Sequence, residues 1–228
     1  MAHRGNRSRF PENTPAAFRQ AIADGADIVE TDLHVSSDGA FVCIHDATLE
    51  RATGLRGAVG DMTLAQLKSL PGGEEGAMPT LAEMAALVPN DVLLAVELKS
   101  ERFTEYTVCR SMVGELEEAG IRNRTIALSF HRSFLRVLRS VAPDIPLGHI
   151  TYICPWPHGD TQMLGPFWPL LLLNPLYVLR AHRRGQSVCP LDSHPDSCLW
   201  FYRLLGCDAI LTDNPEATLR KLGRKPKK

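Results

Sequence analysis

The regular alternation of strand-like and helix-like segments constrains this chain more than any other feature of its sequence. Between the strand-like segments, apolar residues recur at helical spacing, as in residues 104–120 and 133–142. Eight segments have strand character: residues 1–4, 27–33, 92–98, 124–130, 145–150, 170–173, 187–191 and 208–212. Repeated β-then-α units favour a parallel sheet covered by helices, and eight of them predict an α/β fold of the (β/α)8 type, a TIM barrel.

One stretch departs from this rhythm. Residues 36–46 predict a β-hairpin, because Asp38-Gly39 is a favoured pair for a tight turn and residues 40–45 return as a strand. Residues 46–79 are too long for a simple loop and predict a small insertion after the second strand. We therefore expect one domain over residues 1–222, followed by a basic tail at 223–228.

Composition limits the partners that this chain can have. The net charge of −1 provides no overall field for nucleic acid or an anionic membrane. The six cysteines form no CxxC or CxxH pair, which argues against a zinc site and against a disulfide framework.

No membrane anchor is expected either. The first residues lack the charged and apolar regions of a secretory leader. The most apolar stretch, residues 163–179, is interrupted by three prolines and an asparagine, and a membrane span needs about 20 mostly apolar residues. We expect a cytoplasmic protein with no nucleic-acid partner and no stable membrane insertion; its oligomeric state stays open.

Polar residues gather at the predicted C-terminal ends of the early strands, where (β/α)8 enzymes carry their catalytic groups. These residues are His3, Arg4, Glu30, Asp32, His45, Glu97 and Lys99. They divide into a carboxylate group, a histidine pair and two cations.

The carboxylates predict a metal site. Glu30 and Asp32 are two apart on a strand, so both side chains point to one face, and Glu97 on the next barrel strand can reach the same place. Three converging carboxylates suit one divalent cation, Mg²⁺ or Ca²⁺, with Mn²⁺ as a further option. The alternative is a set of barrel salt bridges, in which Glu97 pairs with Lys99 and Glu30 with an arginine. His34 continues the alternation as a fourth ligand or as a structural residue.

The histidines and cations predict phosphoryl chemistry. His3 and His45 stand at strand ends beside the carboxylates, where two imidazoles can act as base and acid; the alternative is a surface or core role. Arg4 and Lys99 provide the positive charge that a phosphodiester requires. No Walker-type or dinucleotide-binding glycine motif is present.

Several short motifs in register resemble the glycerophosphodiester phosphodiesterase family. They are AHRG, PENTPAAF, GADIVETDLHVSSDG, IHD, MPTLAE, AVELK and GCDAILTDNP, and they extend from residue 2 to about residue 217. The resemblance implies a (β/α)8 barrel with an insertion after strand two and a small-molecule glycerophosphodiester substrate. It also implies that His3 and His45 are the acid/base pair, that Glu30, Asp32 and Glu97 hold the metal, and that Arg4 and Lys99 bind phosphate.

The chain departs from the family pattern at two places. Only Met1 and Ala2 precede the HRG motif, and the strand-seven segment carries Pro190 and Leu191 where the family usually has a tryptophan. Trp156 and Trp168 lie instead between prolines in a predicted loop, which suggests apolar contacts for a lipid chain. Two alternatives to glycerophosphodiester hydrolysis are therefore kept: a lysophospholipase D, and a non-catalytic barrel that binds phosphorylated polyols.

Overall fold

A single mostly parallel sheet organises the computed structural model, which describes residues 1–70 and 78–224. Its strand order is β2-β1-β3-β4-β5-β6-β7, and every neighbouring pair is parallel except β1 and β2. The strands are β1 (Ile28–Val35), β2 (Phe41–Cys43), β3 (Leu93–Leu98), β4 (Thr125–Ser129), β5 (Leu147–Thr151), β6 (Met163–Pro166) and β7 (Ser187–Val188).

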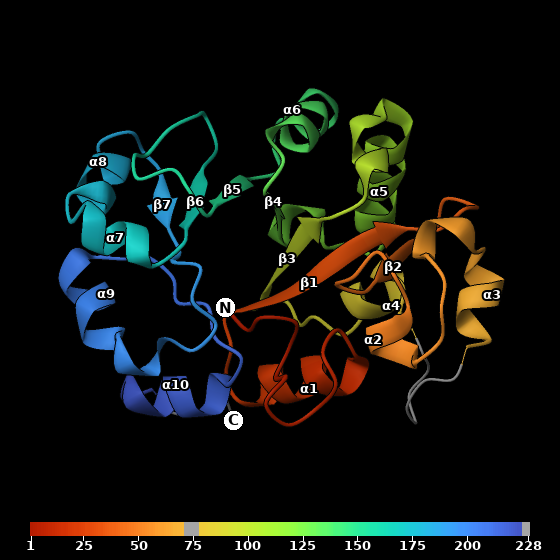
Figure 1. Ribbon diagram of the computed structural model, residues 1–228, viewed down its shortest axis with the longest axis horizontal. Helices are drawn as coiled ribbons and strands as arrows, with labels where there is room; N and C mark the ends of the chain where they lie inside the picture. The colour runs from red at the N-terminus through yellow and green to blue at the C-terminus, as the bar shows by residue number, and fades with distance from the viewer. Residues whose placement is uncertain (71–77, 225–228) are drawn as a thin grey trace.

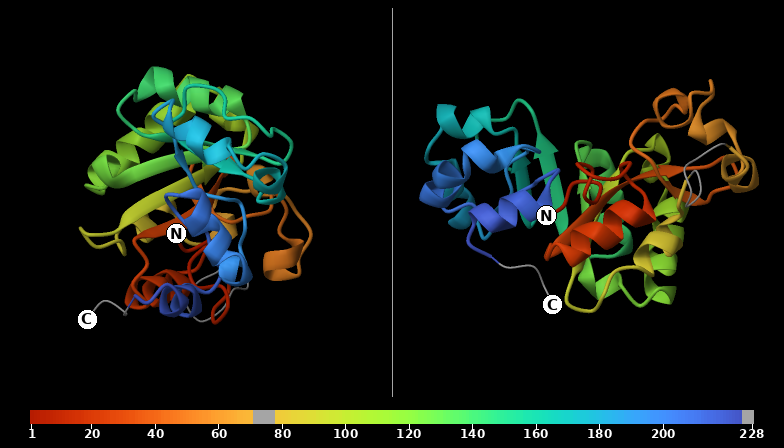
Figure 2. Two further views of the ribbon diagram at one scale, coloured as in Figure 1. Left: turned by 90° about the vertical axis from the view of Figure 1, so that its left-hand side faces the viewer. Right: turned by 90° about the horizontal axis from the view of Figure 1, so that it is seen from below.

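Helices lie outside the ring of strands (Figure 1). They are α1 (Pro15–Ala23), α2 (Glu50–Thr53), α3 (Leu64–Lys68), α4 (Leu81–Ala85), α5 (Tyr106–Glu118), α6 (Arg132–Val141), α7 (Pro169–Leu173), α8 (Tyr177–His182), α9 (Leu199–Leu205) and α10 (Pro215–Lys221). The largest apolar core lies among β1, β3, α1, α4, α5 and α6, and a smaller one joins β6 and β7 to α7, α8 and α9. Figure 2 shows these two groups of helices on opposite sides of the N-terminus. Within the described parts of the chain, no helix has the length and apolar character needed to cross a bilayer.

The predicted barrel is confirmed, although its sheet is not strictly closed. The expected strands at residues 1–4 and 208–212 reduce to isolated bridges, because Ala2 alone pairs with both Val29 and Thr212. Toward β7, the backbone amide of Asp208 donates a hydrogen bond to the carbonyl of Val188, without forming a regular strand pair. The first residues of the chain thus lie between β1 and the segment that precedes α10.

The prediction of a strand at residues 170–173 is wrong. These leucines belong to α7, and the strand expected there is instead β6, which begins seven residues earlier at Met163. Pro169 occupies the first helical turn of α7, a position that its fixed φ angle suits, and leucine is a strong helix former. An apolar run of this length is too short to show which periodicity it follows.

The predicted hairpin and insertion are both present. β2 pairs antiparallel with β1 around a turn in which Gly39 has a φ angle of +91°. The insertion carries α2 and α3, and it forms a small core with β2 that includes Val42, Leu49 and Leu67. Part of the predicted insertion (71–77) and most of the predicted tail (225–228) lie outside the described residues. Arg224, at the start of that tail, pairs with Asp27.

A tight turn after Ala2 directs His3 and Arg4 toward the middle of the barrel. Arg4 and Gly5 both adopt left-handed backbone, with φ angles of +57° and +81°. A Cβ atom on Gly5 would lie 2.6 Å from the carbonyl carbon of Ala17 in α1, so the backbone can pass α1 only as glycine. The glycine of the HRG motif is therefore required by packing.

Replacing Gly5 by alanine should destabilise the protein and reduce its activity. The left-handed backbone alone costs an alanine about 1–2 kcal/mol, and the contact with Ala17 adds to this because α1 cannot move without disturbing β1. Chemical denaturation would measure the loss in free energy of unfolding.

Two glycines provide matched controls. Gly120 also has a positive φ angle, +65°, but no atom stands within 4 Å of the place that a Cβ would occupy, so Gly120→Ala isolates the backbone cost. Gly114 lies inside α5 with equally open space, and Gly114→Ala should stabilise by about 0.5–1 kcal/mol. A Gly5→Ala variant no less stable than Gly120→Ala would contradict the packing argument.

Candidate active site

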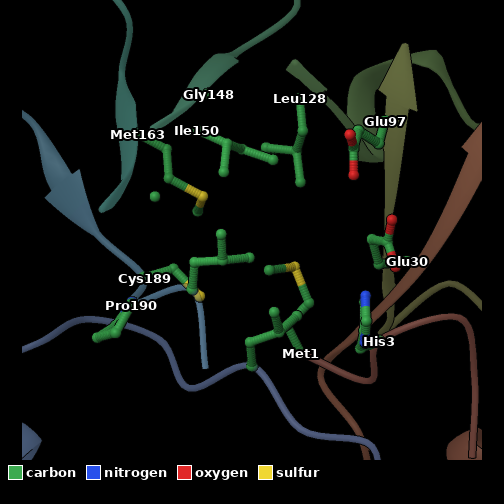
Figure 3. A pocket seen from close by; sticks show the side chains of 13 residues that line it. Met1, His3, Glu30, Glu97, Leu128, Gly148, Ile150, Met163, Cys189 and Pro190 are labelled. Carbon is green, nitrogen blue, oxygen red and sulfur yellow. The ribbon is translucent and has the colours of Figure 1, made fainter. Parts of the chain in front are cut away.

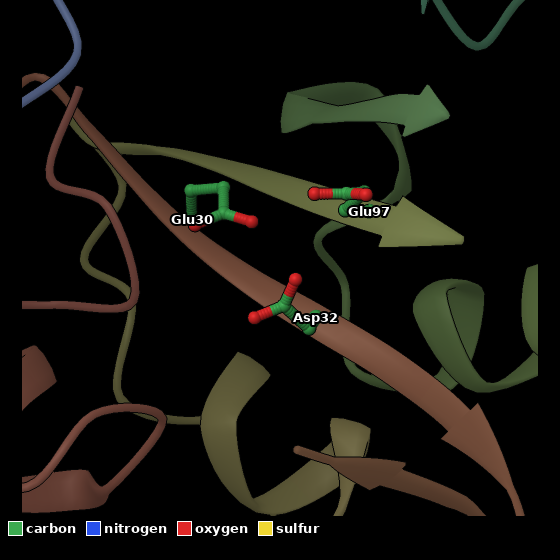
Figure 4. A group of neighbouring side chains, drawn as sticks. All are labelled: Glu30, Asp32 and Glu97. Carbon is green, nitrogen blue, oxygen red and sulfur yellow. The ribbon is translucent and has the colours of Figure 1, made fainter. Parts of the chain in front are cut away.

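Three buried carboxylates from two adjacent strands meet at the centre of the site. The parallel register places Asp32 of β1 opposite Glu97 of β3, and Glu30 lies one alternation earlier on the same face of β1. One oxygen from each of Glu30, Asp32 and Glu97 lies within 4.8 Å of the others. Figure 4 shows the three side chains projecting toward a common space. The predicted convergence is present.

Arg4 and Lys99 provide the positive charge closest to these carboxylates. Arg4 Nε lies 3.0 Å from Asp32 Oδ2, and the Arg4 backbone amide donates to Glu30 Oε2 at 2.9 Å. Lys99 Nζ lies 2.9 Å from Glu97 Oε1 and 3.4 Å from Asp32 Oδ1. The salt-bridge alternative is thus correct for the pair Glu97–Lys99, but these contacts occupy only some of the carboxylate oxygens.

Burial and mutual repulsion change the proton affinities of the three carboxylates. Burial, followed by the neighbouring charges of Asp32 and Glu97, raises the pKa of Glu30 well above its ordinary value. Burial and Asp32 raise the pKa of Glu97 to about 7. Burial would also raise the pKa of Asp32, but Arg4 and Lys99 outweigh it and hold that pKa below its ordinary value. Without a further cation, the cluster therefore retains protons near neutral pH.

The donor atoms fit a hard divalent cation. Asp32 Oδ1 and Glu97 Oε1 are buried beside Lys99 Nζ, but neither oxygen forms a hydrogen bond of good geometry, so both keep lone pairs available for a further cation. Carboxylate oxygens are the ligands that Mg²⁺ and Ca²⁺ prefer. The cluster could thus hold such an ion through Glu30, Asp32 and Glu97.

His3 and His45 have the same local arrangement. His3 Nδ1 lies 2.7 Å from Asp213 Oδ1, and His45 Nδ1 lies 2.6 Å from Asp46 Oδ1. A carboxylate at Nδ1 fixes that nitrogen as the N–H, which leaves Nε2 as the nitrogen that exchanges protons. Burial lowers the pKa of His45, against the opposing effects of Asp32 and Asp46, so this imidazole is neutral near pH 7.

Sequence reasoning did not assign the carboxylates that orient the histidines. Asp46 directly follows His45 in the IHD motif, and Asp213 lies in the ILTDNP segment, 210 residues from His3. Two further polar residues were also missed. Glu12 accepts from Arg4 Nη1 at 3.0 Å, and Asn13 donates to Asp32 Oδ2 at 3.0 Å. Both belong to the PENT motif, and this motif was the only sequence feature that could have pointed to their place in the site.

Among the other histidines, His194 lines the same cleft as His3 and His45, and its Nε2 lies 3.6 Å from Asp213 Oδ2. His34 Nε2 is 3.1 Å from the carbonyl oxygen of His45, and His34 is not among the three clustered ligands. It supports the loop that carries His45, in line with the structural alternative. His131 packs on Phe134, and His182 pairs with Asp208 on the outer surface.

A cleft of about 370 Å³ gives access to the cluster. It is lined by three histidines (His3, His45 and His194), by both cations, and by an apolar wall. The wall comprises Phe130, Tyr152, Phe167, Trp168 and Leu191. Trp168 thus lies where the sequence placed an apolar contact, whereas Trp156 is not part of the lining and stacks against Arg180.

A smaller cavity of about 40 Å³ continues into the barrel. Figure 3 shows His3, Glu30 and Glu97 on one side of it and Met163, Cys189 and Pro190 across from them. Pro190 and Leu191, which replace the expected tryptophan, line this cavity, and Leu191 also lines the outer cleft.

Comparisons with known proteins identify the family and support the fold. The model of the "Glycerophosphoryl diester phosphodiesterase family" matches residues 3–217. The chain is 34% identical to a glycerophosphodiester phosphodiesterase of Caldanaerobacter subterraneus, over 99% of this chain and 97% of that protein. It is also similar to a phosphodiesterase of Oleispira antarctica solved in complex with its product sn-glycerol-3-phosphate, with 25% identity, a TM-score of 0.88 and coverage of 97% and 95%. A Thermotoga maritima structure with 24% identity and a TM-score of 0.79 supports the fold, covering 96% of each chain.

The carboxylate cluster should make stability depend on a divalent cation, and more so at high pH. The folded protein binds protons at Glu97 up to about pH 7, whereas the ordinary value is 4.5, so this group lowers stability as pH rises between these values. A bound cation removes that penalty. In thermal unfolding, Mg²⁺ added to chelated protein should therefore raise the melting temperature more at about pH 8 than at about pH 5.

The variant Glu97→Gln is the control for this experiment, because it keeps the side-chain shape but removes a negative ligand. It should respond weakly to Mg²⁺ at either pH. An equal response in both proteins would place the cation elsewhere.

Proposed function

This chain belongs to the glycerophosphoryl diester phosphodiesterase family, and from that premise we propose that it hydrolyses glycerophosphodiesters to glycerol 3-phosphate and a free alcohol by metal-dependent acid/base catalysis. The activity resides in a single barrel domain over residues 1–222. The observation that carries the proposal is the pair of aspartate-oriented histidines, His3 and His45, lining one cleft beside three buried carboxylates.

Charge determines how the phosphodiester lies in the cleft. Arg4 and Lys99 bind the phosphate oxygens, since both line the cleft and neither can accept a proton from the substrate. Glu30, Asp32 and Glu97 hold one divalent cation, Mg²⁺ or Ca²⁺, with Mn²⁺ also suited. When bound, this ion neutralises the negative charge that develops at phosphorus.

The histidines move the protons. His45 is the base, because burial keeps its imidazole neutral at pH 7, and its Nε2 takes the proton of the attacking oxygen. That oxygen belongs to water or to the neighbouring glycerol hydroxyl. His3 is the acid: Asp213 orients its ring through Nδ1, and Nε2 delivers a proton to the departing alkoxide. A barrel that only binds phosphorylated polyols needs no such pair of oriented imidazoles.

Alanine at His3 or His45 should reduce kcat for glycerophosphocholine by about 10²–10⁴-fold, the usual contribution of a general acid or base. His131→Ala and His182→Ala are matched controls, because both rings lie outside the cleft and should leave turnover near normal. A His45→Ala protein that kept more than about a tenth of the rate would overturn the two-histidine mechanism.

A second activity, on lysophospholipids, is favoured by the apolar wall of the cleft. The rings of Phe130, Tyr152 and Phe167 form a continuous row, with centroids 4.9 Å and 5.5 Å apart. Tyr152 is 57% exposed, and the next residue, Ile153, is 86% exposed. A row of rings that extends from Lys99 to the rim could contact an acyl chain, and each buried methylene contributes about 0.8 kcal/mol.

Lysophosphatidylcholine should therefore be hydrolysed alongside glycerophosphocholine when both are compared below the micelle concentration. Tyr152→Ala should lower kcat/KM for the lipid more than for the water-soluble diester. Tyr106→Ala is the matched control, since Tyr106 is similarly exposed (53%) but lies on α5. A preference of more than about 100-fold for the water-soluble diester would exclude a role of the apolar wall in lipid binding.

A further inference from the structure

A second cleft lies outside the barrel, between α6 and the connection from β5 to β6. Its volume is about 380 Å³. Arg132, Arg136 and Arg139 of α6 line one side, and Gly159, Asp160 and Thr161 of the connection line the other. No residue is shared with the lining of the catalytic cleft.

The three arginines lie on one face of α6, because their spacing of four and three residues matches the helical repeat. Within residues 1–70 and 78–224, none of the three forms an ion pair with a carboxylate. Arg139 contacts only neutral acceptors, the carbonyl oxygen of Asp160 at 3.3 Å and Gln162 Oε1 at 3.2 Å. The cleft thus holds three positive charges without a compensating carboxylate contact.

His149 forms the inner end of this cleft. Its neighbours Gly148 and Ile150 line the cavity inside the barrel, so alternation along β5 directs His149 outward, toward α6. The side chain is only 6% exposed, and its Nδ1 has no hydrogen-bond partner. Burial, together with His158 and Arg132, lowers the pKa of His149 to about 4, so the ring is a neutral group in positive surroundings.

An unpaired buried polar nitrogen is costly unless a ligand supplies its partner. The ligand must carry negative charge to suit three guanidinium groups, and guanidinium forks match phosphate oxygens in geometry. From these contacts we propose that Arg132, Arg136, Arg139 and His149 form a second anion site that binds a phosphate group. The ligand is a small phosphorylated compound or the phosphate headgroup of a lipid.

Inorganic phosphate titrated into the intact protein would test the site by NMR of the histidine ring protons, with His149→Gln used to assign the His149 signal. The His149 signal should shift saturably, whereas phosphate in the catalytic cleft would act on His3 and His45. Arg136→Glu should weaken this binding at least about tenfold, the usual effect of losing a charge-assisted contact.

Arg136 is a suitable probe because its side chain is exposed and contributes little to the packing of α6. Arg203→Glu on α9 is the matched control and should bind phosphate like the parent protein. A His149 signal that phosphate does not move, or moves equally in Arg136→Glu, would overturn the proposal. Hydrolysis of glycerophosphocholine should be unchanged in Arg136→Glu, so failure of the second site and failure of the proposed activity are separate results.

Vesicles distinguish the two sources of the phosphate group. If the site binds a lipid headgroup, the protein should sediment with phosphatidylcholine vesicles that contain phosphatidate. It should not sediment with vesicles that lack phosphatidate, and Arg136→Glu should abolish the sedimentation. A saturable His149 shift with no such sedimentation would assign it to a soluble phosphorylated compound.

Discussion

The burial of three carboxylates beside one another is the constraint on which the rest of this structure depends. Burial and repulsion within the group raise the pKa values of Glu30 and Glu97, and nearby positive charge or bound protons relieve that repulsion. Arg4 reaches the group because the backbone turns sharply after Ala2, with left-handed angles at Arg4 and Gly5. The strained turn, the glycine packed on α1 and the ion pairs of Arg4 are therefore consequences of one electrostatic requirement.

The same requirement links distant parts of the chain. Glu12 accepts from Arg4 and from Arg51 of the insertion, and Arg51 also contacts Asp46, which orients His45. Arg7 bridges Glu12 and Asp213, the partner of His3. Alternating charges thus connect both histidines to the turn that carries Arg4. A substitution at one member of this network should change the orientation of both imidazoles, because the carboxylates that orient them are linked through arginines that share Glu12.

Residue spacing and position at the predicted strand ends were enough to predict that the carboxylates, the cations and both histidines lie together. Residues two apart on a strand share a face, and parallel strands end at one edge, so Glu30, Asp32 and Glu97 could be brought together without coordinates. The β-then-α rhythm likewise specified the barrel. This pattern gave a wrong prediction at residues 170–173, because four consecutive leucines satisfy helix and strand patterns equally. It also overestimated the first and eighth strands, which consist of single bridges made by tertiary contacts. Asp213 was not predicted, because its contact with His3 depends on how the two ends of the chain come together in the barrel.

The two faces of strand β5 line two different cavities, one inside the barrel and one outside it. Its inward residues, Gly148 and Ile150, line the apolar part of the inner cavity. Its outward residue, His149, meets the arginines of α6. A Cβ atom on Gly148 would lie 2.4 Å from Leu128 Cδ2, so a side chain on the inner face there would require Leu128 to shift, while the outer face accepts a buried imidazole. Because β5 packs against Leu128 on its inner face, we expect an anion bound outside β5 to leave the three carboxylates on β1 and β3 in place. We therefore expect the two proposed sites to bind their phosphate groups independently. Any coupling between them would have to pass through the connection between β5 and β6. This connection carries Tyr152, which lines the catalytic cleft, and Gly159, which lines the second cleft.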